Sequence, residues 1–97
     1  MNNKHYILGK NHELIETDLM TWAKNLETGD RIVKQENIGD VRVSTVFLGI
    51  DHNFGEGEPL LFETMIFGGE HDQYQDRCFT WEQAEEMHKK AVKLLTP

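Results

Sequence analysis

The sequence predicts an α+β fold, with an antiparallel sheet of about four strands and two helices covering it. Two runs rich in β-branched and aromatic residues, 41–50 and 60–68, flank a segment that contains two glycines and a proline. This is the composition of two paired strands and their connection. Two further segments, about 18–27 and 81–95, repeat apolar residues at helical spacing. The strands follow one another without a crossover, so we expect a simple meander.

The central hairpin determines which residues share a face of the sheet. We expect Ile50 to lie opposite Leu60, which places Phe47 opposite Glu63. Even-numbered residues then share one face and odd-numbered residues the other, and both faces are mostly apolar. Both faces therefore need cover. We expect the two helices to cover the even face, and the N-terminal hairpin or a second copy of the protein to pack on the odd face.

The N-terminal third predicts a short hairpin followed by a helix. The arms 5–8 and 13–16 flank a turn-rich tetrapeptide, Gly9-Lys10-Asn11-His12. Thr17 or Asp18 can then cap a helix whose apolar residues recur with a period of three to four. Gly29 suits the position just past the end of that helix.

The segments on either side of the central hairpin predict the remaining elements. Residues 31–36 form a strand that leads through a turn containing Gly39 into the hairpin. After the hairpin, residues 74–79 form a short strand. Thr80 and Gln83 match the capping-box pattern and so begin the last helix at residue 81.

Length and composition are typical of one small folded domain. The chain has 97 residues, 38% apolar and 28% charged, which favours a globular protein over a disordered one. We expect residues 1–97 to form a single domain. No apolar run approaches the roughly 18 residues of a membrane helix, and the start lacks the apolar region of a secretory signal. Cys78 is the single cysteine, so no internal disulfide is expected, and these features favour a reducing cytoplasm.

The charge distribution excludes one class of partner and suggests another. The net charge is −7, which makes nucleic acid an unfavourable ligand. Between Arg42 and Arg77 there is no lysine or arginine. An acidic surface for a basic partner or a cation is one interpretation of this stretch, and ordinary solvation of loops is the other. Its acidic members are Asp51, Glu56, Glu58, Glu63, Glu70, Asp72 and Asp76.

The connection 51–59 is the first candidate binding site, because it is longer than most hairpin loops. Its candidate residues are Asp51, His52, Asn53, Phe54, Glu56 and Glu58. A calcium loop of the EF-hand type is excluded, since its sixth position is Glu56 instead of glycine. A weak cation site through the acids is one hypothesis. The other is that Asp51 and Asn53 bond the backbone of the loop itself.

His52 and His71 do not form a metal site in this arrangement, since the hairpin places them at opposite ends, about 26 Å apart. No other metal-ligand spacing is present, so neither a metal nor another cofactor is predicted.

Glu63 is the second candidate, because it interrupts an apolar strand. A buried carboxylate there would have a raised pKa or receive a ligand amine. The alternative is that Glu63 lies on a solvent-exposed part of the face and pairs with Lys34 or Arg31.

Other side chains that could carry chemistry have simpler structural interpretations. Cys78 beside Arg77 could be a thiolate nucleophile, but no histidine is placed to activate it, and a buried small apolar residue is favoured. His88 lies on the apolar stripe of the last helix and is interpreted as a packing residue. No phosphate-binding or nucleophile motif is present, so enzymatic activity is not predicted.

Several blocks of the sequence resemble a group of small proteins encoded by tailed phages and bacterial prophages. The specific block is Gly39-Asp40-Val41-Arg42-Val43-Ser44-Thr45-Val46-Phe47-Leu48-Gly49, followed by Asp51-His52-Asn53-Phe54, Pro59-Leu60-Leu61-Phe62-Glu63-Thr64-Met65 and Phe67-Gly68-Gly69. The resemblance extends over roughly residues 6–91. It implies a phage or prophage accessory protein made in the cytoplasm of a bacterial host, and it carries no functional residues over.

These observations leave two main functional hypotheses. The first is a non-enzymatic binding module, such as an inhibitor of a host or defence protein, because the chain is small, acidic and without catalytic spacing. The second is a homodimer that binds a small molecule or nucleotide in a pocket near Glu63 and the loop 51–59. The expected partners are therefore a host protein or a second copy of the chain, without nucleic acid or membrane.

Overall fold

The computed structural model describes residues 4–28, 31–51 and 57–96, which form six strands and two helices. Strands β3 to β6 make a four-stranded antiparallel sheet in sequence order, and β1 pairs with β2 in a separate hairpin. The predicted α+β fold, with its antiparallel meander, two helices and N-terminal hairpin, is confirmed. The elements are β1 (His5–Leu8), β2 (Leu14–Thr17), α1 (Leu19–Thr28), β3 (Ile32–Ile38), β4 (Val41–Phe47), β5 (Phe62–Phe67), β6 (Gln75–Cys78) and α2 (Trp81–Leu95).

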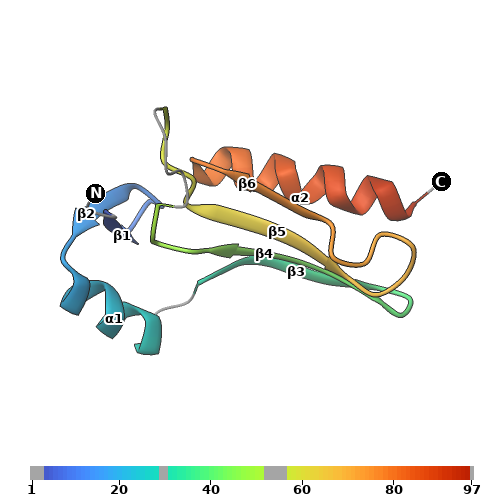
Figure 1. Ribbon diagram of the computed structural model, residues 1–97, viewed down its shortest axis with the longest axis horizontal. Helices are drawn as coiled ribbons and strands as arrows, with labels where there is room; N and C mark the ends of the chain where they lie inside the picture. The colour runs from blue at the N-terminus through green and yellow to red at the C-terminus, as the bar shows by residue number, and fades with distance from the viewer. Residues whose placement is uncertain (1–3, 29–30, 52–56, 97) are drawn as a thin grey trace.

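The two helices do not share one face of the sheet, and this prediction was wrong. α2 lies along the four-stranded sheet, whereas α1 lies beyond its end beside the N-terminal hairpin (Figure 1). The reason is the attachment of β1, where Tyr6 N donates to the Gly49 carbonyl at 2.7 Å, just after β4. The hairpin and the helix that follows it are thereby held at the end of the sheet. Trp22 of α1 also lies there, with its indole Nε1 3.4 Å from the Leu48 carbonyl oxygen.

The register of the central hairpin differs from the prediction by one residue. Phe47 pairs with Phe62 and Thr45 pairs with Thr64, so Glu63 lies opposite Val46 and not opposite Phe47. Because side chains alternate along a strand, a shift of one residue moves one whole set to the other face. Odd residues of β4 therefore share a face with even residues of β5. The face beneath α2 contains Val43, Thr45, Phe47, Phe62, Thr64 and Ile66.

The opposite face of the sheet is polar enough to face water, which corrects the expectation of two apolar faces. Gln35 Nε2 donates to Ser44 Oγ there at 3.1 Å, and Arg42 and Gln75 are exposed. An antiparallel sheet commonly leaves one face solvated. The argument that this face must pack the hairpin or a second copy therefore no longer holds.

The core lies between α2 and the sheet in two separate apolar clusters. The first is near the start of α2 and includes Phe47, Phe62 and Met87, with side chains of the N-terminal hairpin packed against it. The second is near the end of α2 and contains Val43, Ile66 and Ala91. Between the two clusters, the buried residues are polar.

The start of α2 is fixed by a capping box, as predicted. Gln83 N donates to Thr80 Oγ1 at 3.1 Å, and Gln83 Oε1 accepts from Thr80 N at 3.1 Å. Two backbone donors at the helix start are thus satisfied by side chains. Within the described ranges, neither helix has the length and apolar character needed to cross a bilayer.

Candidate functional site

A row of polar residues crosses the covered face of the sheet beneath the middle of α2. The register places Lys34, Thr45, Thr64 and Asp76 side by side on four successive strands. The side chains of Thr45 and Thr64 have no accessible surface. Buried hydroxyl groups require hydrogen-bond partners. His88 of α2, which is only 1% exposed, supplies one.

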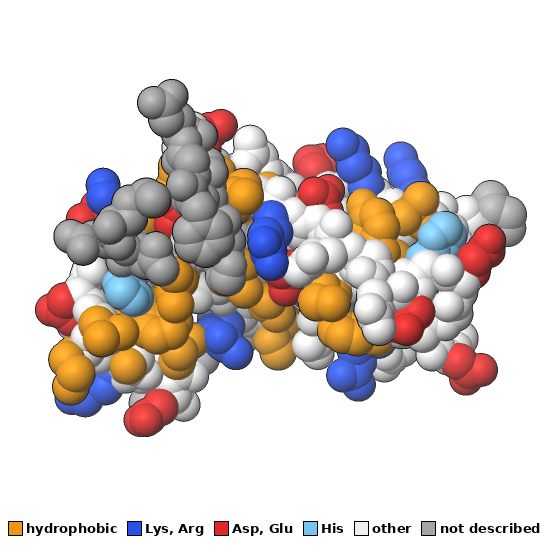
Figure 2. Space-filling view, in the orientation of Figure 1, with side chains coloured by type: hydrophobic (Ala, Val, Ile, Leu, Met, Phe, Trp, Pro, Cys, Tyr) orange, Lys and Arg blue, Asp and Glu red, His pale blue; other side chains and the backbone are white. Residues whose placement is uncertain are grey.

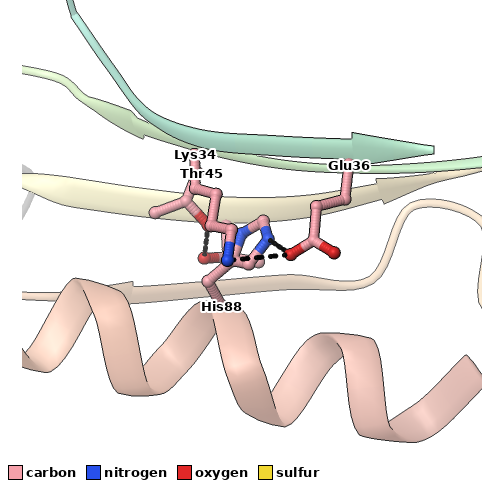
Figure 3. Close-up of polar contacts among 5 residues, drawn as sticks. Lys34, Glu36, Thr45 and His88 are labelled. Carbon is pink, nitrogen blue, oxygen red and sulfur yellow. Dashed lines mark hydrogen bonds and ion pairs between the residues drawn. The ribbon is translucent and has the colours of Figure 1, made fainter. Parts of the chain in front are cut away.

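The buried groups form a continuous chain from the centre of the sheet to its β3 edge (Figure 3). Thr64 Oγ1 lies 2.5 Å from Thr45 Oγ1, which lies 2.7 Å from His88 Nδ1. His88 Nε2 lies 2.9 Å from Glu36 Oε1. Lys34 Nζ reaches the same carboxylate oxygen at 3.4 Å, so the outer end of the chain is an ion pair.

The carboxylate sets the direction of every hydrogen bond in this chain. An ionised carboxylate only accepts, so His88 Nε2 donates to Glu36. For a neutral ring, Nδ1 then accepts from Thr45, whose oxygen accepts from Thr64. The hydrogen bond from His88 is the largest cause that lowers the pKa of Glu36 from its ordinary value.

A carboxylate, an imidazole and a hydroxyl in this order also occur in nucleophilic triads. A nucleophile must reach a substrate, however, and Thr45 is 0% exposed beneath α2. The arrangement therefore fixes α2 to the sheet, and its hydroxyl is not placed to attack a ligand.

A groove of about 540 Å³ lies between β6 and α2, on the side of the sheet opposite to β3. The apolar residues that line it are buried or half-buried, whereas its four carboxylates are exposed. Glu58 and Asp76 come from the stretch without lysine or arginine, and the other two come from α2. The lining residues are Glu58, Leu60, Asp76, Arg77, Cys78, Phe79, Glu82, Gln83, Glu86, Met87 and Lys90.

Cys78 lines this groove but is not activated as a nucleophile. Burial raises the pKa of its thiol to about 11, with a further contribution from the negative charge of Asp76. The thiolate is the reactive form of cysteine, and it is scarce at neutral pH when the pKa is this high. Cys78 packs against the first apolar cluster, as the interpretation as a small apolar residue predicted.

Glu63 lies on the polar face of the sheet, where neighbouring strands satisfy its carboxylate. Its Oε2 accepts from Arg77 Nε at 3.0 Å and also from Gln75 Nε2. The partner is thus Arg77 and neither Lys34 nor Arg31, because β6 and not β3 is the neighbour of β5. A carboxylate already paired with a guanidinium is poorly placed to receive a ligand amine.

The candidate residues of the loop 51–59 are only partly described. Asp51 Oδ1 accepts from Leu60 N at 3.0 Å, so Asp51 bonds the backbone of its own loop, as one of the two hypotheses predicted. Glu58 lines the groove. His52, Asn53, Phe54 and Glu56 lie outside the described residues. Over the part of the chain that is described, no group of three or more histidine, cysteine or acidic side chains could hold a metal ion.

The buried chain was missed by the sequence analysis, which interpreted His88 as a packing residue. Its signals were present but separate: two threonines in apolar strands and a histidine in an apolar helical stripe. Thr45 and His88 are 43 residues apart, so only the fold brings them together.

In comparisons with known proteins, no family model matches the chain, and no curated protein or solved structure is significantly similar to it.

Removing His88 alone should destabilise the fold, because the Thr45 hydroxyl loses its buried acceptor. We expect His88→Leu to cost about 2 kcal/mol of unfolding free energy, measured by urea denaturation. The triple variant with Thr45→Val and Thr64→Val should recover most of this loss, because it leaves no buried polar group without a partner. A triple variant less stable than His88→Leu would contradict this account.

Glu36 should make the fold sensitive to acid. A folded-state pKa below the unfolded value means that Glu36 stabilises the fold above the unfolded pKa, and that this stability is lost as the pH falls through the folded pKa. The difference in stability between the wild type and Glu36→Gln should therefore be largest near neutral pH and shrink in acid. Urea unfolding across that range measures it, with the exposed Glu70→Gln as a control. A difference that does not vary with pH would rule out this role.

Proposed function

We propose that the protein is a non-enzymatic binding module that takes an extended, basic segment of a partner protein in the groove between β6 and α2. The observation that carries this proposal is the combination of an apolar base with four exposed carboxylates, against the two cations Arg77 and Lys90, in one groove of about 540 Å³. Lysine and arginine side chains match such a surface, because their methylene stems pack on apolar groups while their charged ends meet carboxylates.

None of the described residues that line the groove is an activated nucleophile, and this supports binding over catalysis. The thiol of Cys78 is held protonated at neutral pH by its raised pKa. The side chain of Thr45 lies beneath α2 and has no accessible surface. The groove would therefore recognise a ligand by its shape and charge.

The electrostatics of the groove suggest a weak and salt-sensitive interaction. Exposed charges attract a basic partner over distances of about 10 Å, beyond which salt screens them. Such charges contribute more to association rate and specificity than to affinity. The resemblance to phage and prophage proteins supports a bacterial host as the proposed setting, with a host or defence protein as the proposed partner.

Reversing charge in the groove should weaken binding of a basic probe. We expect Glu82→Lys with Glu86→Lys to bind a fluorescein-labelled peptide of alternating lysine and leucine about tenfold more weakly at low salt, since two attractive charges become repulsive. Fluorescence anisotropy measures the affinity.

Glu85→Lys provides the matched control, because Glu85 lies on α2 at its opposite flank beside Val33 and Lys34. A double Glu85→Lys and Lys89→Glu variant keeps the total charge and should bind like the wild type. Equal weakening by Glu85→Lys alone and by the groove variant would show a general charge effect and contradict the proposal.

A second copy of the chain is the alternative partner. Hydrophobic side chains gather at the end of the molecule formed by α1 and the N-terminal hairpin (Figure 2). Among them, Ile15, Leu19 and Met20 are 41%, 56% and 78% exposed. This patch favours self-association at that end, whereas a ligand pocket at Glu63 has little support because its carboxylate is already paired with Arg77.

Self-association should therefore depend on α1. We expect a wild-type mass above 11.3 kDa at micromolar concentration by sedimentation, and a return to that mass for Leu19→Lys with Met20→Lys. A wild-type mass of 11.3 kDa would remove the alternative.

A further inference from the structure

β6 is an edge strand, and within the described part of the chain only β5 pairs with it. The Cys78 carbonyl accepts from Leu61 N at 2.9 Å, so the backbone of Cys78 faces the β5 side. The backbone groups of successive residues point to opposite sides of a strand, so those of Gln75 and Arg77 face away from β5. An outer edge of this kind is a template for pairing with a further strand.

The other edge strand, β3, is less suited to such pairing. Its register shifts between Ile32 and Lys34, and an irregular edge that carries a lysine discourages the addition of a strand. The space between β3 and α2 is about 60 Å³, whereas the groove beside β6 is about 540 Å³. The larger value falls in the range of ligand pockets.

The two walls of the groove run side by side for about the same length. On the strand side, the lining extends from Asp76 to Phe79, which is about 10 Å of extended chain. On the helix side, it extends from Glu82 to Lys90, which is about 12 Å of α-helix. A ligand in extended conformation can therefore contact both walls at once.

Alternation along an added strand would direct every second side chain toward α2. Asp76 pairs with Thr64 and Cys78 with Phe62, and directly paired residues share a face, so both β6 side chains lie on the face beneath α2. Ligand residues opposite them would point to the same side, where the helix presents the exposed carboxylates of Glu82 and Glu86. Ligand residues between them would point to the polar face of the sheet.

We propose that the basic segment taken by the groove adds to β6 as a fifth, antiparallel strand, with lysine or arginine at every second position directed toward α2. This inference rests on the proposed function of the groove. Every strand pair of the sheet is antiparallel, and antiparallel pairing is slightly more stable per residue than parallel pairing. In this mode of binding, main-chain bonds supply affinity and alternate side chains supply specificity. A second copy of the chain, with its net charge of −7, is a poor match for the same carboxylates.

An acidic side chain covers the outer edge of β6 until a basic ligand arrives. Asp76 Oδ1 accepts from the outward N–H of Arg77 at 2.9 Å. Both groups compete with water there, so this bond is exchanged at low cost. A ligand ammonium that draws the carboxylate away leaves the N–H to a ligand carbonyl. The edge is thus protected against neutral strands and open to basic ones.

The first test uses backbone N-methylation of a fluorescein-labelled peptide of alternating lysine and threonine. In the proposed strand, the threonines lie opposite Gln75 and Arg77 and exchange backbone hydrogen bonds with them, whereas the lysine N–H groups point away from β6. Methylation of two central threonines should weaken binding about tenfold or more. Methylation of two central lysines should leave the affinity close to that of the unmodified peptide. Fluorescence anisotropy at low salt measures all three.

The second test removes the outward donor from the protein. Proline lacks an N–H and is tolerated where that group faces away from the neighbouring strand. Arg77→Pro should therefore bind the unmodified peptide about fivefold more weakly than Arg77→Ala. Both variants lose the ion pair with Glu63, so the comparison isolates the backbone group. Circular dichroism checks that both are folded.

Equal affinities of the two methylated peptides would overturn the added strand and leave groove binding intact. A loss confined to the lysine-methylated peptide, or equal binding by Arg77→Pro and Arg77→Ala, would also overturn it. A peptide with glutamine in place of lysine that binds as tightly would show that the edge accepts any strand, a second copy included, and would contradict the basic specificity. If the unmodified peptide does not bind at all, the proposed function itself fails.

Discussion

The hydroxyls of Thr45 and Thr64 meet in the centre of the sheet, and the rest of the structure is arranged around their need for hydrogen bonds. A buried hydroxyl without a partner costs about 1–3 kcal/mol, which is a large fraction of the stability of a small domain. His88 satisfies this pair from α2, and Glu36 holds the ring from the edge strand β3. Hydrophobic packing alone would tolerate small shifts of α2 along the sheet, whereas this chain of directional bonds defines one position. The apolar core is divided at the same place, with one cluster on either side of the polar row.

The helices and the meander could be predicted because their signals are local. The capping box of Thr80 and Gln83 and the apolar stripe that follows begin and end α2 at residues 81 and 95, as observed. The register could not be predicted, because the connection after β4 is too long to impose one. Apolar residues occupy both odd and even positions of the two strands, so two registers one residue apart fit the pattern equally well. The pairing of Thr45 with Thr64 decides between them, since it places both hydroxyls where His88 can reach them.

The position of α1 could not be predicted from the hydrophobic pattern either. Its apolar stripe predicts a helix with a buried side but not the surface against which that side packs. That surface is set by the backbone hydrogen bond from Tyr6 of β1 to Gly49 in the segment after β4, two residues 43 positions apart in the chain. Gly49 permits the close approach, because its φ is +76° and an added Cβ would lie 2.5 Å from the indole nitrogen of Trp22. A glycine at the end of an apolar run indicates that another element packs closely against the backbone there, but it does not identify that element.

The sequence predicted the negative charge of the groove, but neither its position nor most of the residues that line it. The stretch without lysine or arginine does contribute carboxylates to the groove, through Glu58 and Asp76, but among its described acids Asp51, Glu63, Glu70 and Asp72 do not line it. α2 packs over all four strands of the sheet, the bond between His88 and Glu36 fixes its position relative to β3, and the groove lies between the helix and β6 at the opposite edge. A helix whose position is fixed by directional bonds does not slide to close such a groove. A cavity that exists before a ligand arrives costs the ligand less ordering free energy than one that must open. Under the proposed function, the buried chain therefore fixes one wall of the groove, although its hydroxyls have no accessible surface and none of its residues lines the groove.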